Sequence, residues 1–192
     1  MSRTNVLGVE FDNVTMQEAV ERALELISAR SCAYCATPNP EIVMLAKEDA
    51  ALREALAGAD MVLPDGAGIV KGAAILGRPM KQKVPGIDFA CGVMAQLAER
   101  GGSVYLFGAK PGVAEAAGQT LKGMFPGLVI SGTSDGYFSD DGPIIEKISA
   151  AAPDMLLVCL GAPKQELWMA KMAGKLPLGL MVGLGGSLDV FA

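Results

Sequence analysis

The chain has 192 residues, of which 51% are hydrophobic and 5% aromatic, and it contains 24 glycines and 11 prolines. This length allows one domain with a sizeable core, and aliphatic content interrupted by turns favours an α/β fold over a β-sandwich. The absence of histidine excludes a Ser-His-Asp or Cys-His nucleophile system and a Cys₂His₂ zinc site, so acid–base work falls to carboxylates. The net charge of −5 argues against a non-specific nucleic-acid binder, which needs a basic face.

The four cysteines, Cys32, Cys35, Cys91 and Cys159, lie in apolar stretches and are typical of reduced, buried thiols in a cytosolic protein. Cys32 and Cys35 have the CxxC spacing of metal and redox sites. They fall in a predicted strand, however, where alternation directs residues three apart to opposite faces. No signal peptide is visible at the N-terminus, and the apolar stretch 176–188 is too short and too rich in glycine for a transmembrane helix.

The first half of the chain alternates between helical and strand-like patterns. A capping box at residues 15–18, followed by an apolar stripe to Ile27, predicts a helix, and residues 31–36 follow as a strand. Asn39 suits an N-cap and Pro40 the first helical position, which predicts a helix to about Asp49. The remaining elements predicted in this half are a short strand at 61–63 and helices at 69–76 and 87–100.

From Ser103 onward the pattern is a regular β-α-β-α-β-α-β succession. Strands are predicted at 104–107, 128–131, 155–160 and 179–182, and helices at 113–124, 144–151 and 165–172. Near-continuous apolar strands separated by amphipathic helices predict a Rossmann-like parallel sheet with helices on both faces. Because such sheets bind ligands beyond the carboxyl ends of their strands, the loops at those ends are the candidate sites.

The loop Gly108-Ala109-Lys110-Pro111-Gly112 follows a predicted strand and opens a helix. Its backbone amides, the helix dipole and the lysine can meet a phosphate, and a plain βα turn explains it equally well. It matches neither the dinucleotide fingerprint G-x-G-x-x-G nor the P-loop.

Three further loops of the second half carry polar groups or glycines. In Asp135-Gly136-Tyr137-Phe138, the carboxylate can accept ribose hydroxyls while an aromatic ring stacks on a base; the alternative is a turn with buried aromatics. Gly161-Ala162-Pro163-Lys164-Gln165-Glu166 places polar groups where a helix begins, for which simple capping is the alternative. Gly183-Leu184-Gly185-Gly186 has so little side chain that a ligand or another backbone must come close.

Thr37, Asn39 and Asp65 lie just past strand ends of the first half. For Asn39, an N-cap is as good an explanation as a functional role. For Asp65, a tight Pro-Asp-Gly turn is an equally good alternative. In a chain without histidine, Asp65 is nevertheless one of the few carboxylates placed to act as a general base. Between Asp65 and Asp88 the charged residues are all basic: Lys71, Arg78, Lys81 and Lys83. A solvated face is the simplest interpretation of this stretch.

Seven motifs, in the same order, resemble those of the WecG/TagA/CpsF glycosyltransferases. They are TPNPE at 37–41, LPDG at 63–66, KVPGID at 83–88, FGAKPGV at 107–113, DGYF at 135–138, LGAPKQELW at 160–168 and GLGGSLDVFA at 183–192. Seven ordered motifs over nearly the whole chain are far more specific than any one of them. The resemblance implies inverting transfer of N-acetylmannosamine from UDP-ManNAc to the 4-hydroxyl of N-acetylglucosamine on undecaprenyl diphosphate, in wall teichoic acid synthesis and without a metal or other cofactor.

The resemblance also assigns roles to residues at matching positions. Asp65 looks like the base that deprotonates the acceptor hydroxyl, Thr37 and Asn39 position sugar in the same pocket, and Gln165 lies near the donor. Lys83 stands where many relatives have arginine, which keeps the charge but loses the bidentate fork for a diphosphate. UDP is expected to contact Gly108, Ala109, Lys110, Asp135, Gly136, Tyr137, Phe138, Gly161, Pro163, Lys164 and Gly185. No metal ligand is expected, since the sequence has no D-x-D motif.

Relatives continue past the motif at Gly185–Phe191 with an arginine-bearing C-terminal segment, whereas this chain stops at Ala192. We therefore expect residues 1–192 to form a single catalytic core that lacks this segment. The resemblance implies a cytoplasmic protein, peripheral on the inner face of the cell membrane, and we expect the absent segment to make the membrane contact. We also expect the truncated core to form a homo-oligomer, because the surface that this segment would cover should be apolar. Two alternatives stay open: a nucleotide-binding Rossmann-type module or dehydrogenase, against which the incomplete glycine fingerprint argues, and an inactive scaffold.

Overall fold

The computed structural model describes residues 2–192, and its central element is a six-stranded parallel sheet. The strands in chain order are β3 (Ala33–Ala36), β4 (Met61–Val62), β5 (Ser103–Gly108), β6 (Val129–Ser134), β7 (Met155–Cys159) and β8 (Leu180–Gly183). Across the sheet their order is β4-β3-β8-β7-β5-β6. The predicted α/β class and the parallel sheet are therefore confirmed.

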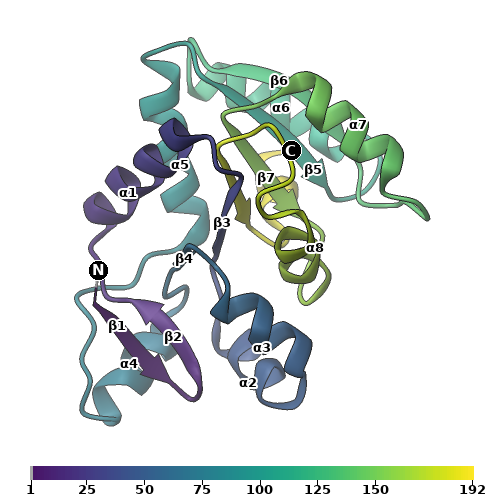
Figure 1. Ribbon diagram of the computed structural model, residues 1–192. Helices are drawn as coiled ribbons and strands as arrows, with labels where there is room; N and C mark the ends of the chain where they lie inside the picture. The colour runs from purple at the N-terminus through teal and green to yellow at the C-terminus, as the bar shows by residue number, and fades with distance from the viewer. Residues whose placement is uncertain (1) are drawn as a thin grey trace.

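Helices cover both faces of this sheet, as predicted (Figure 1). One face packs against α1 (Met16–Ala29), α5 (Gly86–Ala98), α6 (Val113–Met124) and α9 (Ser187–Phe191). The other packs against α2 (Pro40–Glu48), α3 (Ala50–Ala57), α7 (Gly142–Ala151) and α8 (Lys164–Met172). The antiparallel hairpin of β1 (Arg3–Val6) and β2 (Val9–Asp12) packs with α4 (Ala67–Ile75), at the lower left of Figure 1.

Strand β3 shows how the two cores are separated. Cys35 belongs to the cluster on the α1 side of the sheet, whereas Tyr34 and Cys32 belong to the cluster on the opposite side. The CxxC pair therefore spans the sheet, as the alternation predicts. The prediction that all four cysteines are buried is wrong for Cys91, which is only half-buried because α5 directs the neighbouring Ala90 and Val93 into the core.

Side-chain caps fix the helix starts that were predicted. Thr15 Oγ1 accepts a hydrogen bond from the Glu18 amide at 3.2 Å, and Glu18 returns one by accepting from the Thr15 amide at 2.7 Å. Asn39 Oδ1 accepts from the Ile42 amide at 3.0 Å and begins α2. These bonds satisfy amides that the first helical turn leaves without partners.

The structure corrects the prediction at several short elements. The hairpin, α3 and α9 were missed, because strands of four residues and helices of eight and five are too short to show a clear period. Strand β6 continues to Ser134 rather than ending at 131, since Gly132 and Thr133 still pair with β5. Within residues 2–192 no helix is long and apolar enough to cross a membrane, and the stretch 176–188 contains β8 and the beginning of α9.

Candidate active site

The loops that follow the six strands meet at one edge of the sheet, because all neighbouring strands pair in parallel. In the order of the sheet, this edge carries Asp65 after β4, Thr37 and Asn39 after β3, Gly185 after β8, Lys164 after β7, Lys110 after β5 and Asp135 after β6. The candidate residues of the first half therefore lie at one end of the edge and those of the second half at the other. This is the edge at which parallel α/β sheets bind ligands.

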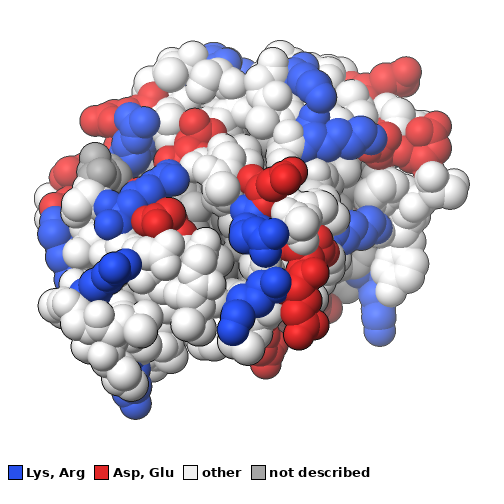
Figure 2. Space-filling view, turned by 60° about the horizontal axis from the view of Figure 1, so that its bottom comes forward, with Lys and Arg blue, Asp and Glu red and all other residues white. Residues whose placement is uncertain are grey.

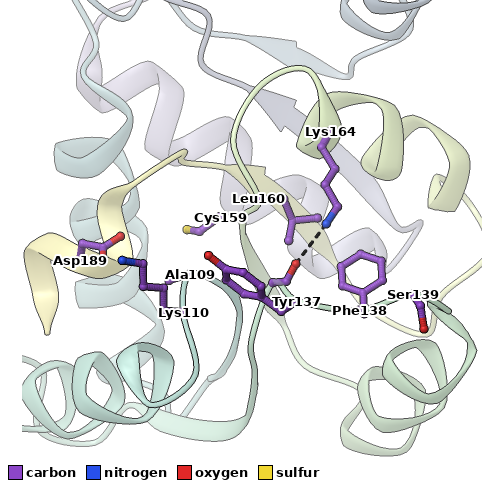
Figure 3. A pocket seen from close by; sticks show the side chains of 10 residues that line it. Ala109, Lys110, Tyr137, Phe138, Ser139, Cys159, Leu160, Lys164 and Asp189 are labelled. Carbon is purple, nitrogen blue, oxygen red and sulfur yellow. Dashed lines mark hydrogen bonds between the residues drawn. The ribbon is translucent and has the colours of Figure 1, made fainter.

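A pocket of about 720 Å³ lies at the β7-β5-β6 end of the edge. Figure 3 shows its lining residues: Ala109, Lys110, Gly136, Tyr137, Phe138, Ser139, Cys159, Leu160, Lys164 and Asp189. Six of them were predicted to contact UDP, namely Ala109, Lys110, Gly136, Tyr137, Phe138 and Lys164. The volume is in the range of small-molecule sites.

The two aromatic residues of the pocket are placed differently. The Phe138 ring packs against Phe107, with 5.5 Å between their centroids, and Lys164 Nζ lies 4.0 Å from the Phe138 centroid. Tyr137 is 70% exposed, and Figure 3 shows its ring between the side chains of Lys110 and Phe138. Phe138 is thus part of the wall, whereas Tyr137 offers a free ring face on which a flat ligand can stack.

Two lysines bring positive charge to this pocket. Lys164 Nζ donates a hydrogen bond to the Gly136 carbonyl oxygen at 3.0 Å, which ties α8 to the loop after β6. Lys110 is exposed and points toward Asp189 of α9 on the other side of Tyr137 (Figure 3). The arrangement suits an anionic group bound between the loops after β5 and β7.

Two predicted UDP contacts, Asp135 and Gly108, have structural roles instead of lining this pocket, and Ala109 lines it but has its amide engaged. Asp135 Oδ1 accepts from the Tyr137 amide at 2.8 Å, and the residue lines a neighbouring pocket of about 400 Å³. Gly108 has φ +134°, and a Cβ there would collide with the Cys159 carbonyl oxygen. The Ala109 amide donates to that same oxygen at 3.1 Å, so this amide is not available to a phosphate as expected.

The other predicted UDP contacts, Gly161, Pro163 and Gly185, also lie outside the lining of this pocket. Four lining residues were missed by the sequence analysis: Ser139, Cys159, Leu160 and Asp189. Cys159 and Leu160 stand at the carboxyl end of β7, and Ser139 directly follows the DGYF motif. Their positions next to a strand end and a predicted loop were therefore the signal in the sequence that could have identified them. Burial raises the pKa of the Cys159 thiol to about 12, so this cysteine is neutral and unsuited to nucleophilic attack.

Thr37 and Gln165 hold the loop after β8 from its two sides. Thr37 Oγ1 donates to the Gly183 carbonyl oxygen at 2.7 Å, and Gln165 Oε1 accepts from the Gly185 amide at 2.9 Å. Both side chains are buried. The structure therefore gives them a backbone-positioning role at the centre of the edge.

Glu166 is a buried carboxyl next to this contact, with 1% of the residue exposed. Gln165 Nε2 donates to its Oε1 at 2.8 Å, while its Oε2 has no hydrogen-bond partner among residues 2–192. Burial raises the pKa of Glu166, and the hydrogen bond from Gln165 offsets part of this effect.

Asp65 is half-buried in the turn after β4. Its Oδ2 accepts from the amide of Gly86, the first residue of α5, at 3.1 Å. The Val84 amide donates to the Pro64 carbonyl oxygen at 3.0 Å, which keeps the segment with Lys83 beside the same turn. Lys83 is exposed and belongs to none of the ion pairs within residues 2–192. One carboxylate and one unpaired cation thus stand together at this end of the edge.

Comparison with known proteins identifies the family. Residues 4–192 match the model of the glycosyl transferase WecG/TagA/CpsF family. The N-acetylglucosaminyldiphosphoundecaprenol N-acetyl-beta-D-mannosaminyltransferase of Bacillus spizizenii is 36% identical over 160 residues, which are 83% of this chain and 62% of that protein. The protein of the same name from Staphylococcus aureus strain NCTC 8325 is 33% identical over 196 aligned positions, which cover all of this chain and 76% of that protein. The chain thus spans between 62% and 76% of the length of these relatives, and it belongs to the WecG/TagA/CpsF glycosyltransferase family.

Proposed function

We propose that this chain is an inverting glycosyltransferase that moves N-acetylmannosamine from UDP-ManNAc to undecaprenyl-diphosphate-linked N-acetylglucosamine, a step of wall teichoic acid linkage-unit synthesis. Family membership supports this proposal, as do the transferred sugar and the acceptor in the names of the relatives. The observation that carries it is the common edge, on which a pocket with an exposed tyrosine and two lysines is combined with the Asp65 turn. The comparisons do not favour the dehydrogenase or binding-module alternatives.

The pocket at the β7-β5-β6 end is the proposed UDP site. Tyr137 stacks on the uracil ring, and Lys110 and Lys164 bind the diphosphate. Lys164 is held by the Gly136 carbonyl oxygen and the Phe138 ring, so little side-chain freedom is lost when it contacts the ligand. Asp135 acts through its hydrogen bond to the Tyr137 amide, which sets the position of the aromatic residue.

The chemical step is assigned to Asp65. Its carboxylate accepts the proton of the acceptor 4-hydroxyl while the hydroxyl oxygen forms a bond to the anomeric carbon of the donor sugar. The bond from that carbon to UDP breaks on the opposite face, UDP leaves with the electron pair, and the configuration inverts. Lysines at the diphosphate stabilise the negative charge that develops on the leaving group. The side-chain oxygen of Asn39 accepts the capping hydrogen bond from the Ile42 amide, so its side-chain nitrogen can donate to the acceptor sugar.

The substitution Asp65→Asn tests this assignment. Asparagine keeps an oxygen that accepts from the Gly86 amide, so the turn should persist while the base is lost. We expect kcat to fall by roughly 10²–10⁴, with UDP affinity measured by calorimetry unchanged. Asp88→Asn is the matched control, because it removes an exposed carboxylate from the first turn of α5 and should leave turnover near the wild-type value. Near-normal turnover of Asp65→Asn would contradict the role of this residue.

Metal independence is the second part of the proposal. It follows from the absence of a D-x-D motif in the sequence and from the lysines that can neutralise the diphosphate. Turnover is expected to be unchanged after treatment with EDTA. Loss of turnover in EDTA that added magnesium restores would overturn it.

The proposed acceptor carries a polyprenyl chain, which places the reaction at a membrane surface. We propose that the protein acts peripherally at the inner face of the cell membrane. Membrane contact through a further C-terminal segment, and self-association of the core without it, stay predictions. Comparison of this chain with a version extended to the length of its relatives, by light scattering and vesicle binding, tests both.

A further inference from the structure

An apolar surface lies beside the Asp65 end of the sheet edge, where the β1–β2 turn meets α2 and α4. Four large apolar side chains are exposed there: Leu7 by 49%, Met44 by 52%, Ile75 by 86% and Leu76 by 49%. They line a groove of about 270 Å³, whose lining residues are all apolar or glycine. Contiguous exposed apolar surface of this kind marks an interaction site more often than scattered apolar residues do. We call it the apolar groove.

The apolar groove opens next to the residues assigned to the acceptor. Pro40 and Gly68 line it, and they follow Asn39 and Asp65 by one and three residues. A Cβ at Gly68 would lie 2.7 Å from Pro40 Cγ, so the beginnings of α2 and α4 are in close contact. The apolar groove therefore begins within three residues of Asn39 and Asp65.

Basic side chains border this groove. Lys71 lies one helical turn before Ile75, and Arg78 follows Leu76 by two residues. Lys47 and Arg53 line a smaller pocket that shares Leu7 with the groove. None of these four cations belongs to an ion pair of residues 2–192. In Figure 2 the lower left of the molecule is mainly uncharged, and several basic side chains lie around it.

We propose that the apolar groove and its basic border dock on the surface of an anionic lipid bilayer. Ile75 and Leu76 enter the boundary between headgroups and acyl chains, and Lys71 and Arg78 contact lipid phosphates. The inference rests on the proposed function, because this orientation presents Asp65 to a sugar that a lipid diphosphate holds just above the bilayer. Exposed apolar side chains next to unpaired cations are typical of such interfacial contacts.

A second copy of the chain fits this surface less well than a bilayer does. In a symmetric dimer the same patch faces itself, and the four cations around the groove outnumber the exposed carboxylates of α2, Glu41 and Glu48, so the interface would concentrate positive charge. A partner seated there would also crowd the beginnings of α2 and α4, next to Asn39 and Asp65. Anionic headgroups, in contrast, neutralise the border and leave the acceptor beside these two residues.

Sedimentation with vesicles tests the proposal. Wild type is expected to bind vesicles of equimolar phosphatidylglycerol and phosphatidylcholine more strongly than vesicles of phosphatidylcholine alone. Ile75→Ser with Leu76→Ser should weaken binding to the anionic vesicles by about tenfold or more, because apolar surface is lost. Lys71→Gln with Arg78→Gln should weaken it by about fivefold for each charge, and only on anionic vesicles.

The matched control is Met124→Ser with Val129→Ser, at the last residue of α6 and the first residue of β6. These side chains are 51% and 48% exposed, comparable to Leu7, Met44 and Leu76 of the groove, but they lie at β6, the outer strand farthest from β4 in the sheet order. This variant should bind vesicles as wild type does. Circular dichroism of all variants identifies any that fail to fold. Lys71→Gln with Arg78→Gln changes only exposed side chains, so this variant should fold and still test the proposal if the serine variant does not fold.

Two outcomes would overturn the proposal: no binding of wild type to anionic vesicles, or equal loss in the control. A concentration-dependent dimer that Ile75→Ser with Leu76→Ser abolishes, without vesicle binding, would also overturn it by identifying a second copy as the occupant. Turnover separates this inference from the proposed function. The groove variant should keep wild-type turnover of a soluble N-acetylglucosamine diphosphate with a short alkyl chain, and lose about tenfold on vesicle-embedded acceptor. If wild type turns over neither acceptor while vesicle binding follows the expected pattern, the proposed function fails and the membrane surface stands.

Discussion

Replacing Glu166 with glutamine is expected to raise the free energy of unfolding at neutral and alkaline pH. The carboxyl is 1% exposed, and one of its oxygens has no partner among residues 2–192. Glutamine retains an oxygen that accepts from Gln165 Nε2, so the one existing hydrogen bond persists. The substitution therefore removes a buried charge while it keeps the shape of the site.

The sign of the pH dependence follows from the direction of the pKa shift. Burial raises the pKa of Glu166 in the folded state above its ordinary value of 4.5. The carboxyl group therefore contributes stability that is complete below pH 4.5 and is lost as the pH rises through the raised folded-state pKa. At higher pH, wild type bears the cost of a buried carboxylate with one unpaired oxygen, about 1–3 kcal/mol. Glutamine does not titrate, so the advantage of Glu166→Gln grows with pH toward this magnitude.

Urea denaturation at about pH 4.5 and about pH 8 measures the difference. Glu54→Gln, which neutralises an exposed carboxylate on α3, is the control and should change the free energy of unfolding by no more than about 0.5 kcal/mol at either pH. A difference between Glu166→Gln and wild type that is the same at both pH values would refute the reasoning. So would a lower stability of this variant at the higher pH.

Two further predictions concern the pocket and the loops around it. Tyr137→Ala is expected to weaken UDP binding, measured by calorimetry, by roughly five- to a hundredfold, since a stacked base contributes about 1–3 kcal/mol. Asp135→Ala should weaken UDP binding less. Unchanged affinity in both variants would place UDP elsewhere. Gly108→Ala should lower the free energy of unfolding by about 3 kcal/mol or more, because both its φ of +134° and the Cys159 carbonyl oxygen oppose a Cβ. Gly112 has φ +89° but no atom within 4 Å of an added Cβ, so Gly112→Ala should lower the free energy of unfolding by only about 1–2 kcal/mol. If both variants lose the same free energy of unfolding, the collision with the Cys159 carbonyl oxygen is excluded as a cause.

The fold was predictable where the hydrophobic period is sustained. From β5 to β8, strands alternate with helices of nine to twelve residues, and β5, β7 and β8 are buried almost throughout, so their apolar runs are visible in the sequence. Helices α1 and α2 were predicted from local capping signals, which involve residues only three apart. The hairpin escaped prediction because Arg3–Asp12 and Asp12–Val62 contacts stabilise it, and the second of these joins residues that are 50 apart.

The candidate site was predictable to the level of loops but not of hydrogen bonds. The rule that parallel sheets bind ligands at the carboxyl ends of their strands identified every loop that lines the pocket. It did not identify helix α9, which contributes Asp189. The bond from Thr37 to Gly183 joins residues 146 apart, and no local pattern encodes it. For the same reason the engagement of the Ala109 amide by Cys159 was not visible. Long-range contacts thus decide which groups in a correctly predicted loop stay free for a ligand.

Strand β8 explains how the two halves of the edge are kept in register. It pairs with β3, which precedes Thr37 and Asn39, proposed for the acceptor, and with β7, which precedes the loop proposed for the donor. Thr37 fixes the Gly183 carbonyl from the first side, and Gln165 fixes the Gly185 amide from the second, so the end of β8 and the loop after it are held by both halves. A transfer reaction needs the acceptor oxygen and the donor carbon at a defined separation, because misplacement by about 1 Å can cost a hundredfold in rate. A loop bonded to both halves provides that constraint through backbone atoms, and this accounts for the burial of Thr37 and Gln165, two polar residues that the family pattern assigns to substrate.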